Sequence, residues 1–154
     1  MTPADLSAQQ RAEAVRDRML ADDTVLQTLG ISVASVGPGS ASCRMTVRAD
    51  MLNGFAICHG GLVATLADTA FAYACNAYDE LTVASGFSLD LLAPSHQGDV
   101  LTAVAREVSK TGRTGLYDIE VHNQKNERVA IFRGRSYTMK GRPVIGGMPL
   151  RGGA

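Results

Sequence analysis

A single long apolar segment without proline or glycine constrains the fold of this chain more than any other feature. Residues 62–77 are rich in alanine and follow a pair of glycines, which predicts a helix over about 60–77. On either side of it, apolar and polar residues alternate with a period of two, the pattern of half-buried β-strands. One helix cannot cover both faces of a broad sheet. We therefore predict an α+β fold in which a curved antiparallel sheet wraps around one long central helix and packs its other face on another subunit.

Six strands are expected to build this sheet. Two of them form a hairpin around the Gly37-Pro38-Gly39 turn, and four follow the central helix. The turns at 110–114 and 124–127 are so short that their flanking strands must be antiparallel neighbours. The four later strands are expected at 87–91, 100–109, 116–123 and 129–139.

The two ends of the chain differ from this central pattern. Residues 1–29 are mostly polar and helix-favouring and are followed by Gly30, which predicts an N-terminal helical extension outside the main core. Residues 141–154 are rich in glycine and proline and are expected to form a flexible tail. A length of 154 residues fits one domain over 1–154.

Composition excludes several classes of protein. Fifteen Lys+Arg balance fifteen Asp+Glu, whereas a nucleic-acid-binding protein usually carries a basic excess. No apolar run approaches the ~20 residues of a membrane helix, and the first residues do not have the pattern of a secretory signal. The three cysteines lack CxxC spacing, so we expect neither a disulfide framework nor a metal site. We expect a cytoplasmic protein that binds neither nucleic acid nor membranes.

Asp68 is the anomalous residue of the predicted helix. At ~100° per residue it shares a face with small residues such as Ala64 and Ala72, where another backbone or a ligand can approach closely. A carboxylate on so apolar a helix carries a desolvation cost unless it is paired or hydrogen-bonded. Two interpretations stay open: a structural carboxylate bonded to backbone amides or a nearby arginine, and a catalytic group.

The predicted start of the same helix is the second feature. His59-Gly60-Gly61 lets the backbone approach a ligand without side-chain obstruction, and free amides at a helix N-terminus favour negative charge. That arrangement suits the oxyanion formed when a carbonyl is attacked. The Asn53 amide in the preceding loop is placed to orient a water or a base. The structural alternatives are a glycine-rich turn capped by His59 and a simple turn residue at Asn53.

The spacing of these features has a consequence for assembly. Asp68 follows His59 by nine residues, which corresponds to ~13 Å of axial rise in one helix. The two groups are then too far apart to touch one reacting carbonyl. If they act together, they come from different subunits, whose antiparallel helices meet across a two-fold axis. On that condition the sequence predicts two equivalent sites at a dimer interface.

These residues, at these spacings, resemble the hotdog-fold acyl-CoA thioesterases, and most of all those of phenylacetate degradation. The similarity covers about residues 25–140. Beyond the motif, it includes Met51-Leu52-Asn53-Gly54, the helical run from Leu66 to Asn76, Tyr117-Asp118-Ile119-Glu120 and Phe132-Arg133-Gly134.

The resemblance implies a hotdog fold and hydrolysis of phenylacetyl-CoA or hydroxyphenylacetyl-CoA to coenzyme A and the free aryl acid. Asp68 would act as general base or as nucleophile. The Gly60 amide would polarise the thioester carbonyl, with His59 beside it, and Asn53 would help hold water or substrate. No metal or organic cofactor is implied, because coenzyme A is part of the substrate. A homodimer with shared active sites, assembled into a homotetramer, is implied as well.

Further residues are candidates for contacts with the substrate. The coenzyme A moiety is anionic and needs nearby cations, for which Lys110 and Arg113 in one turn are the candidates. Gly61 is a candidate at the helix start. The candidates for lining an acyl pocket are aromatic: Phe55, Phe71 and Tyr78. The alternatives are solvated surface charges and ordinary core aromatics.

Three other functions are weighed against hydrolysis driven by Asp68. A cysteine hydrolase would use Cys58 or Cys75 as its nucleophile, although sequence neighbours such as Cys58 and His59 rarely form a productive pair. A hotdog dehydratase would pair a histidine with a carboxylate. An acyl-CoA-binding sensor without catalysis would have no need of Asp68.

Overall fold

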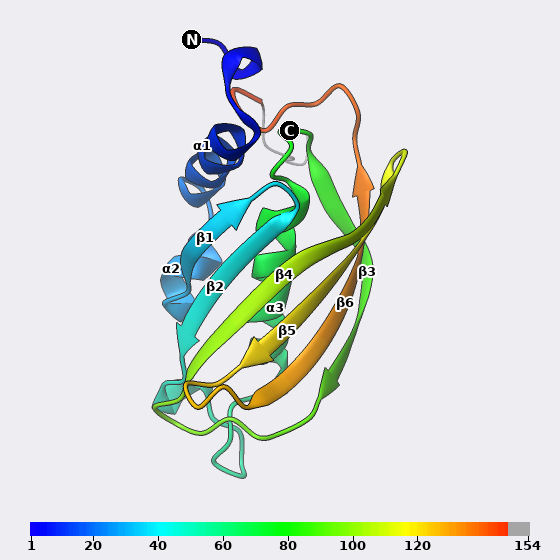
Figure 1. The fold of residues 1–154 in the computed structure, drawn as a ribbon. Coiled ribbons are helices and arrows are strands. Elements are labelled where there is room, and N and C mark those ends of the chain that lie inside the picture. The colour runs from blue at the N-terminus through cyan, green and yellow to red at the C-terminus, as the bar shows by residue number, and fades with distance from the viewer. Residues whose placement is uncertain (148–154) are drawn as a thin grey trace, which may run out of the picture.

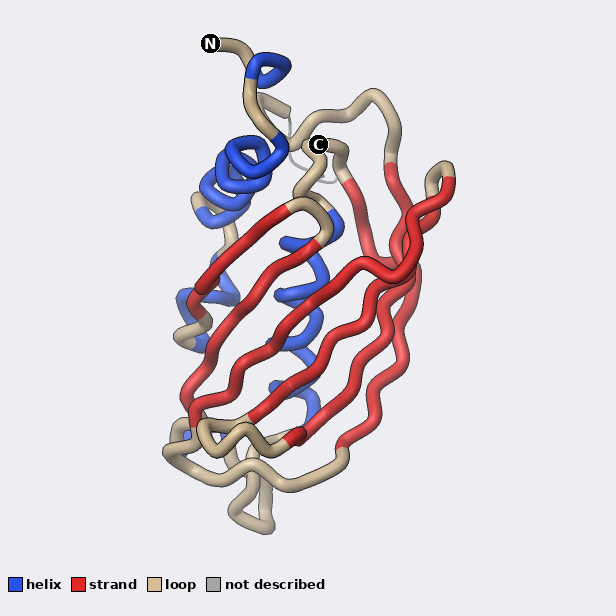
Figure 2. The backbone as a smooth tube through the Cα atoms, in the orientation of Figure 1, coloured by secondary structure: helices blue, strands red, loops and turns tan. Residues whose placement is uncertain are grey.

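The computed structural model describes residues 1–147 of the chain. One antiparallel sheet, with strand order β1-β2-β4-β5-β6-β3, curves around the helix α3 (Gly60–Cys75), as Figures 1 and 2 show. The predicted architecture, a curved sheet around one long helix, is confirmed. The strands are β1 (Ser32–Gly37), β2 (Ser40–Thr46), β3 (Thr82–Leu91), β4 (Val100–Thr111), β5 (Thr114–His122) and β6 (Arg128–Thr138).

The core lies between α3 and the concave face of the sheet. Alternate residues of the central strands are fully buried there, because successive side chains of a strand point to opposite faces. Many of them are small, which lets the helix approach the sheet closely. At Gly134 of β6, an added Cβ would lie 2.8 Å from ring atoms of Phe71, so the absence of a side chain makes room for that ring. The buried strand residues include Ala41, Cys43, Met45, Leu101, Ala103, Ala105, Ile119 and Val121.

Helix α3 ends two residues earlier than predicted, at a polar link to β3. Asn76 donates from Nδ2 to the carbonyls of Ala72 and Thr82, both at 2.9 Å. Its Oδ1 accepts the Thr82 N–H at 2.9 Å. The buried amide therefore satisfies the last turn of the helix and the first residue of the strand together.

Strand β3 begins at Thr82 rather than at 87. The prediction began the strand where Phe87, Leu89 and Leu91 start to alternate with polar residues. In the structure the register with β6 shifts between Ala84 and Gly86, which is the signature of a β-bulge or similar irregularity. The strand continues through this shift, and a simple alternation rule misses such a continuation.

The predicted N-terminal helices are present as α1 (Ala8–Leu20) and α2 (Thr24–Leu29), and Gly30 ends α2 in the left-handed conformation with φ +66°. The expectation that they lie outside the main core is wrong for one face of each helix. Ala12 and Leu26 belong to the same buried cluster as the sheet residues. A mostly polar helix still buries a narrow apolar stripe, and the prediction gave too little weight to these few side chains.

The C-terminal segment is described up to residue 147. Its first part is held to the body, because Asp79 accepts the backbone N–H groups of Val144 and Ile145 at 2.9 and 2.8 Å. Residues 148–154 of the predicted flexible tail lie outside the described residues, and the flexibility of the tail stays a prediction. Within residues 1–147, no helix has the length and apolar character needed to cross a membrane.

Candidate active site

The loop before α3 is shaped by Asn53. Its Oδ1 accepts the N–H groups of Phe55 at 2.9 Å and Ile57 at 3.3 Å. Asn53 is therefore the turn residue that the structural alternative described. The turn uses only the oxygen, and its Nδ2 has no hydrogen-bond partner among residues 1–147. Asn53 thus builds the loop with its oxygen, while the two donors of its NH2 group stay unused within residues 1–147.

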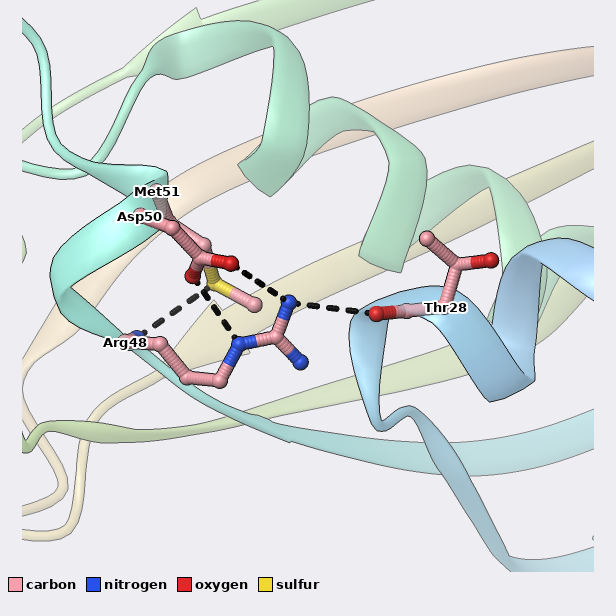
Figure 3. A network of polar contacts seen from close by, with 4 residues as sticks. All are labelled: Thr28, Arg48, Asp50 and Met51. Atoms are coloured by element: carbon pink, nitrogen blue, oxygen red, sulfur yellow. Dashed lines mark hydrogen bonds and ion pairs between the residues drawn. The ribbon is translucent and has the colours of Figure 1, made fainter.

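Arg48 joins this loop to the N-terminal helices, as Figure 3 shows. Its Nη2 donates to the Thr28 carbonyl at 3.1 Å, and its Nε donates to Asp50 Oδ1 at 3.0 Å. The hydrogen bond from Arg48 lowers the pKa of the Asp50 carboxyl. One residue after Asp50, the Met51 carbonyl accepts the His59 N–H at 2.8 Å, just before α3 begins. The sequence did not predict these Arg48 hydrogen bonds, because a single arginine gives no signal of its distant partners.

The start of α3 presents two unused backbone donors. His59 occupies the N-cap position, but its exposed side chain makes no capping hydrogen bond. The N–H groups of Gly60 and Gly61 donate to no acceptor within residues 1–147, as is usual for the first residues of a helix. An added Cβ at Gly60 would lie 2.6 Å from Leu91 Cδ1. The absence of a side chain at Gly60 therefore makes room for Leu91 beside the helix start.

A cavity of about 380 Å³ opens beside this helix start. Its walls come from the start of α3 and from the segment that follows β3. The Cys58 N–H donates to the Ser95 carbonyl at 2.8 Å and joins the two walls. The lining residues are Ile57, Cys58, Gly60, Val63, Leu91, Leu92, Ala93, Pro94 and Ser95. Sequence reasoning missed residues 91–95, although an apolar run continuing past a strand end was a possible signal.

Asp68 lies farther along α3, on the face away from the sheet. This face is only partly buried and includes Ala64 and Ala72, as the predicted small-residue stripe required. Within residues 1–147 its carboxylate makes no hydrogen bond and no ion pair. The structural alternative, a carboxylate bonded to amides or an arginine, is therefore not observed. Burial raises the pKa of Asp68 above its ordinary value.

Asp68 and Gly60 do not meet within one chain. They are eight residues apart on the same helix, about 12 Å along its axis. Asp68 is absent from the lining of the cavity at Gly60. The predicted separation of the two features therefore holds in the folded chain, and a site that uses both groups would need a second subunit.

The other candidate residues lie outside the cavity of the single chain. Phe55 is 87% exposed on the loop, and Gly61 is exposed beside His59. Lys110 and Arg113 lie at the tip of the β4–β5 hairpin, at the end of the sheet opposite the start of α3 (Figure 1).

Three further candidates, Lys110, Tyr78 and Phe71, have contacts that are typical of ordinary surface and core residues. Lys110 Nζ lies 3.9 Å from the ring centroid of Tyr78, whose hydroxyl donates to Glu107 at 3.0 Å. Phe71 is buried in the core, with its ring centroid 5.5 Å from that of Tyr117.

The cysteines lack the properties of a nucleophile. Burial raises the pKa of Cys58 and raises that of Cys75 to about 12. Both thiols are then protonated near neutral pH, whereas the thiolate is the attacking form. Residues 1–147 also contain no group of three or more His, Cys, Asp or Glu side chains able to hold a metal ion.

Comparison with known proteins places this geometry in a wider context. A family model described as "Thioesterase superfamily" matches residues 55–130. Over 123 residues the chain is 47% identical to the "Acyl-coenzyme A thioesterase PaaI" of Escherichia coli (strain K12), a match that covers 80% of this chain and 88% of that relative. It is 34% identical over 128 residues to a "Putative esterase" of Archaeoglobus fulgidus, covering 83% of each.

Solved structures give the same picture. The E. coli PaaI protein from the phenylacetic acid degradation operon matches with a TM-score of 0.86 and 44% sequence identity, covering 88% of this chain and 98% of that chain. A mutant of the phenylacetic acid degradation protein PaaI from Thermus thermophilus matches with a TM-score of 0.73 and 35% identity. That match covers 76% of this chain and 100% of that chain.

Proposed function

Because this chain belongs to the hotdog-fold acyl-CoA thioesterases, we propose that it hydrolyses phenylacetyl-CoA or hydroxyphenylacetyl-CoA to coenzyme A and the free aryl acid. The observation that carries the proposal is the pair of unused amides at Gly60 and Gly61 beside an aliphatic cavity of about 380 Å³. Cavities of this size hold small ligands. The names of the relatives connect them with phenylacetic acid degradation and with acyl-CoA thioester hydrolysis.

The proposed reaction uses the donors of one subunit and the carboxylate of another. The thioester carbonyl oxygen accepts hydrogen bonds from the N–H groups of Gly60 and Gly61, with His59 beside them. The negative charge on this oxygen grows as the carbonyl carbon is attacked. Asp68 of the partner subunit removes a proton from water, whose oxygen adds to the carbonyl carbon. The intermediate collapses by cleavage of the C–S bond, and the coenzyme A thiolate leaves. Alternatively, Asp68 attacks as nucleophile and water hydrolyses the resulting anhydride.

The edge of the sheet supports this assembly. Strand β3 is one of the two edge strands, the other being β1, so one row of its backbone groups is unpaired within the sheet. Phe87 and Leu91 on this strand are 46% and 55% exposed. Leu91 also covers Gly60, so a partner docked on β3 comes close to the start of α3. We propose a homodimer formed along this edge, and a homotetramer built from two such dimers.

Charged and polar groups complete the proposed site. Lys110 and Arg113 lie at the tip of the β4–β5 hairpin, at the end of the sheet opposite the start of α3. We propose that they contact the anionic nucleotide of coenzyme A. The free Nδ2 of Asn53 is assigned to hold water or substrate. Gly61 and Phe55 are assigned contacts with the substrate at the interface.

A panel of thioesters tests the proposed activity. Release of free thiol is followed with a thiol reagent for arylacetyl, acetyl and long-chain acyl-CoA substrates at matched concentrations. We expect the highest kcat/KM for the arylacetyl group. Turnover confined to other acyl groups would contradict the substrate assignment. Tight binding of arylacetyl-CoA without thiol release would favour the acyl-CoA-binding sensor instead.

Mixed dimers test the shared site. Subunits carrying Asp68→Ala are mixed with subunits carrying Gly60→Ala, and both are expected to be nearly inactive alone. Random exchange makes half of the dimers mixed, and each mixed dimer holds one intact site of two. Activity should therefore recover to roughly one quarter of the wild-type value. Native mass spectrometry verifies the exchange, and verified exchange without recovery would show that each site lies within one chain.

A further inference from the structure

Ser95 carries a hydroxyl that the fold leaves without a partner. The residue is only 3% exposed. Among residues 1–147, its Oγ is the one buried side-chain nitrogen or oxygen atom with no hydrogen bond. Native proteins pair nearly all of their buried polar groups, because an unpaired hydroxyl loses its bonds to water without compensation. A buried hydroxyl of this kind therefore points to a group that is missing from the free chain.

The position of Ser95 shows where that group would lie. Ser95 lines the same cavity as Gly60, and the bond from the Cys58 N–H to its carbonyl fixes it beside the start of α3. The other polar side chain of the lining is the Cys58 thiol, which is directed to the His59 carbonyl at 3.7 Å. The rest of the wall is aliphatic or glycine. Ser95 is thus the one residue of the lining whose polar side chain makes no hydrogen bond within residues 1–147, and its hydroxyl is buried beside the cavity.

We propose that Ser95 determines acyl specificity, through a hydrogen bond between its hydroxyl and a hydroxyl on the aromatic ring of the substrate. This inference rests on the proposed function. With the thioester carbonyl held by the Gly60 amide, an arylacetyl ring follows after one methylene and enters the aliphatic cavity. An unsubstituted ring offers Ser95 no partner. A ring hydroxyl can donate or accept, as the serine hydroxyl can.

The expected consequence is a preference for hydroxylated rings. A site built to hydrogen-bond a substrate hydroxyl rejects the analogue that lacks it, because the polar group of the site is then left unpaired. One net hydrogen bond corresponds to about tenfold in kcat/KM. Wild-type enzyme should favour one of the ortho, meta and para isomers of hydroxyphenylacetyl-CoA over phenylacetyl-CoA by this factor.

Ser95→Ala tests the proposal. It should lose about tenfold in kcat/KM on the favoured isomer and change little on phenylacetyl-CoA. Its Tm should be unchanged or higher, since alanine removes an unpaired group, whereas loss of a structural serine would lower it. The matched control is Ser35→Ala, which removes an exposed hydroxyl on β1 and should leave both substrates unaffected.

The outcomes separate this inference from the proposed function. An equal loss on all substrates, or no loss on any isomer, would overturn the role of Ser95 and leave arylacetyl-CoA hydrolysis standing. If the wild type hydrolyses no arylacetyl thioester, the proposed function fails instead. Calorimetric Kd values for the same thioesters then give the ratio of affinities for the hydroxylated and the unsubstituted ring, in wild type and in Ser95→Ala. An unchanged ratio, or no binding, would overturn the role of Ser95 as well.

Discussion

Replacing Asp68 by asparagine is expected to lower kcat by about 10²- to 10⁴-fold, the usual contribution of a positioned base. KM should change far less, because the amide keeps the size of the carboxylate. Thiol release from the best arylacetyl-CoA substrate measures both constants. The matched control is Asp17→Asn, which neutralises an exposed carboxylate paired with Arg16 on α1 and should keep full activity. A fully active Asp68→Asn enzyme would remove Asp68 from the mechanism.

The same substitution has an expected effect on stability that depends on pH. Burial raises the pKa of Asp68 in the folded chain, so the folded state binds its proton more tightly than the unfolded state. The free energy of unfolding therefore falls as pH rises from below the ordinary value of 3.8 through the raised pKa. Asp68→Asn should raise Tm near neutral pH and have little effect near pH ~3. Thermal melts at the two pH values measure this difference, and a lowered Tm at neutral pH would contradict it.

Replacing Gly60 by alanine is the second change with a large expected effect. The new methyl group would lie 2.6 Å from Leu91 Cδ1, which is the tip of a flexible and half-exposed side chain. Leu91 can move aside, so the chain should fold with little change in Tm. The methyl group and the displaced Leu91 would then keep the thioester carbonyl away from the helix amides. Loss of such donors costs about 10²- to 10³-fold in kcat.

A second substitution shows which group blocks the substrate. Leu91→Ala removes the crowded side chain, so the double variant relieves the contact between residues 60 and 91. If activity stays low in the double variant, the Gly60 methyl itself blocks approach to the donors. The control is Gly54→Ala in the preceding loop, where an added Cβ meets nothing within 4 Å. A fully active Gly60→Ala enzyme would contradict the oxyanion role of this helix start.

Much of the fold follows from patterns that are local in sequence. The helix around Asp68 and the alternation in β4 and β5 depend on residues a few positions apart, so periodicity locates them. The separation of Gly60 from Asp68 follows from helix geometry alone. The bulge in β3 was not predictable in this way, because it depends on how β3 and β6 pair across a long sequence distance.

The walls of the site are the harder part to predict. Ser95 reads as a loop serine until the fold places its carbonyl on the Cys58 amide and buries its hydroxyl. From sequence, Arg48 is indistinguishable from an ordinary surface charge. Its role is visible only in the fold, where it lies between α2 and the loop before α3. Both depend on contacts between segments that are distant in the chain. Such contacts leave no periodic signal in a single sequence.

The construction of the cavity bears on how enzymes of this kind change over evolutionary time. One wall is the start of α3, which carries the donors, and the other is the segment 91–95, which lies at the end of an edge strand. Leu91 and Leu92 in that segment are half-exposed and support no part of the central core. Under the proposed function, substitutions in this segment would change the preferred acyl group at little cost in stability. The donors at the start of α3 lie on the other wall and would not be altered by such substitutions.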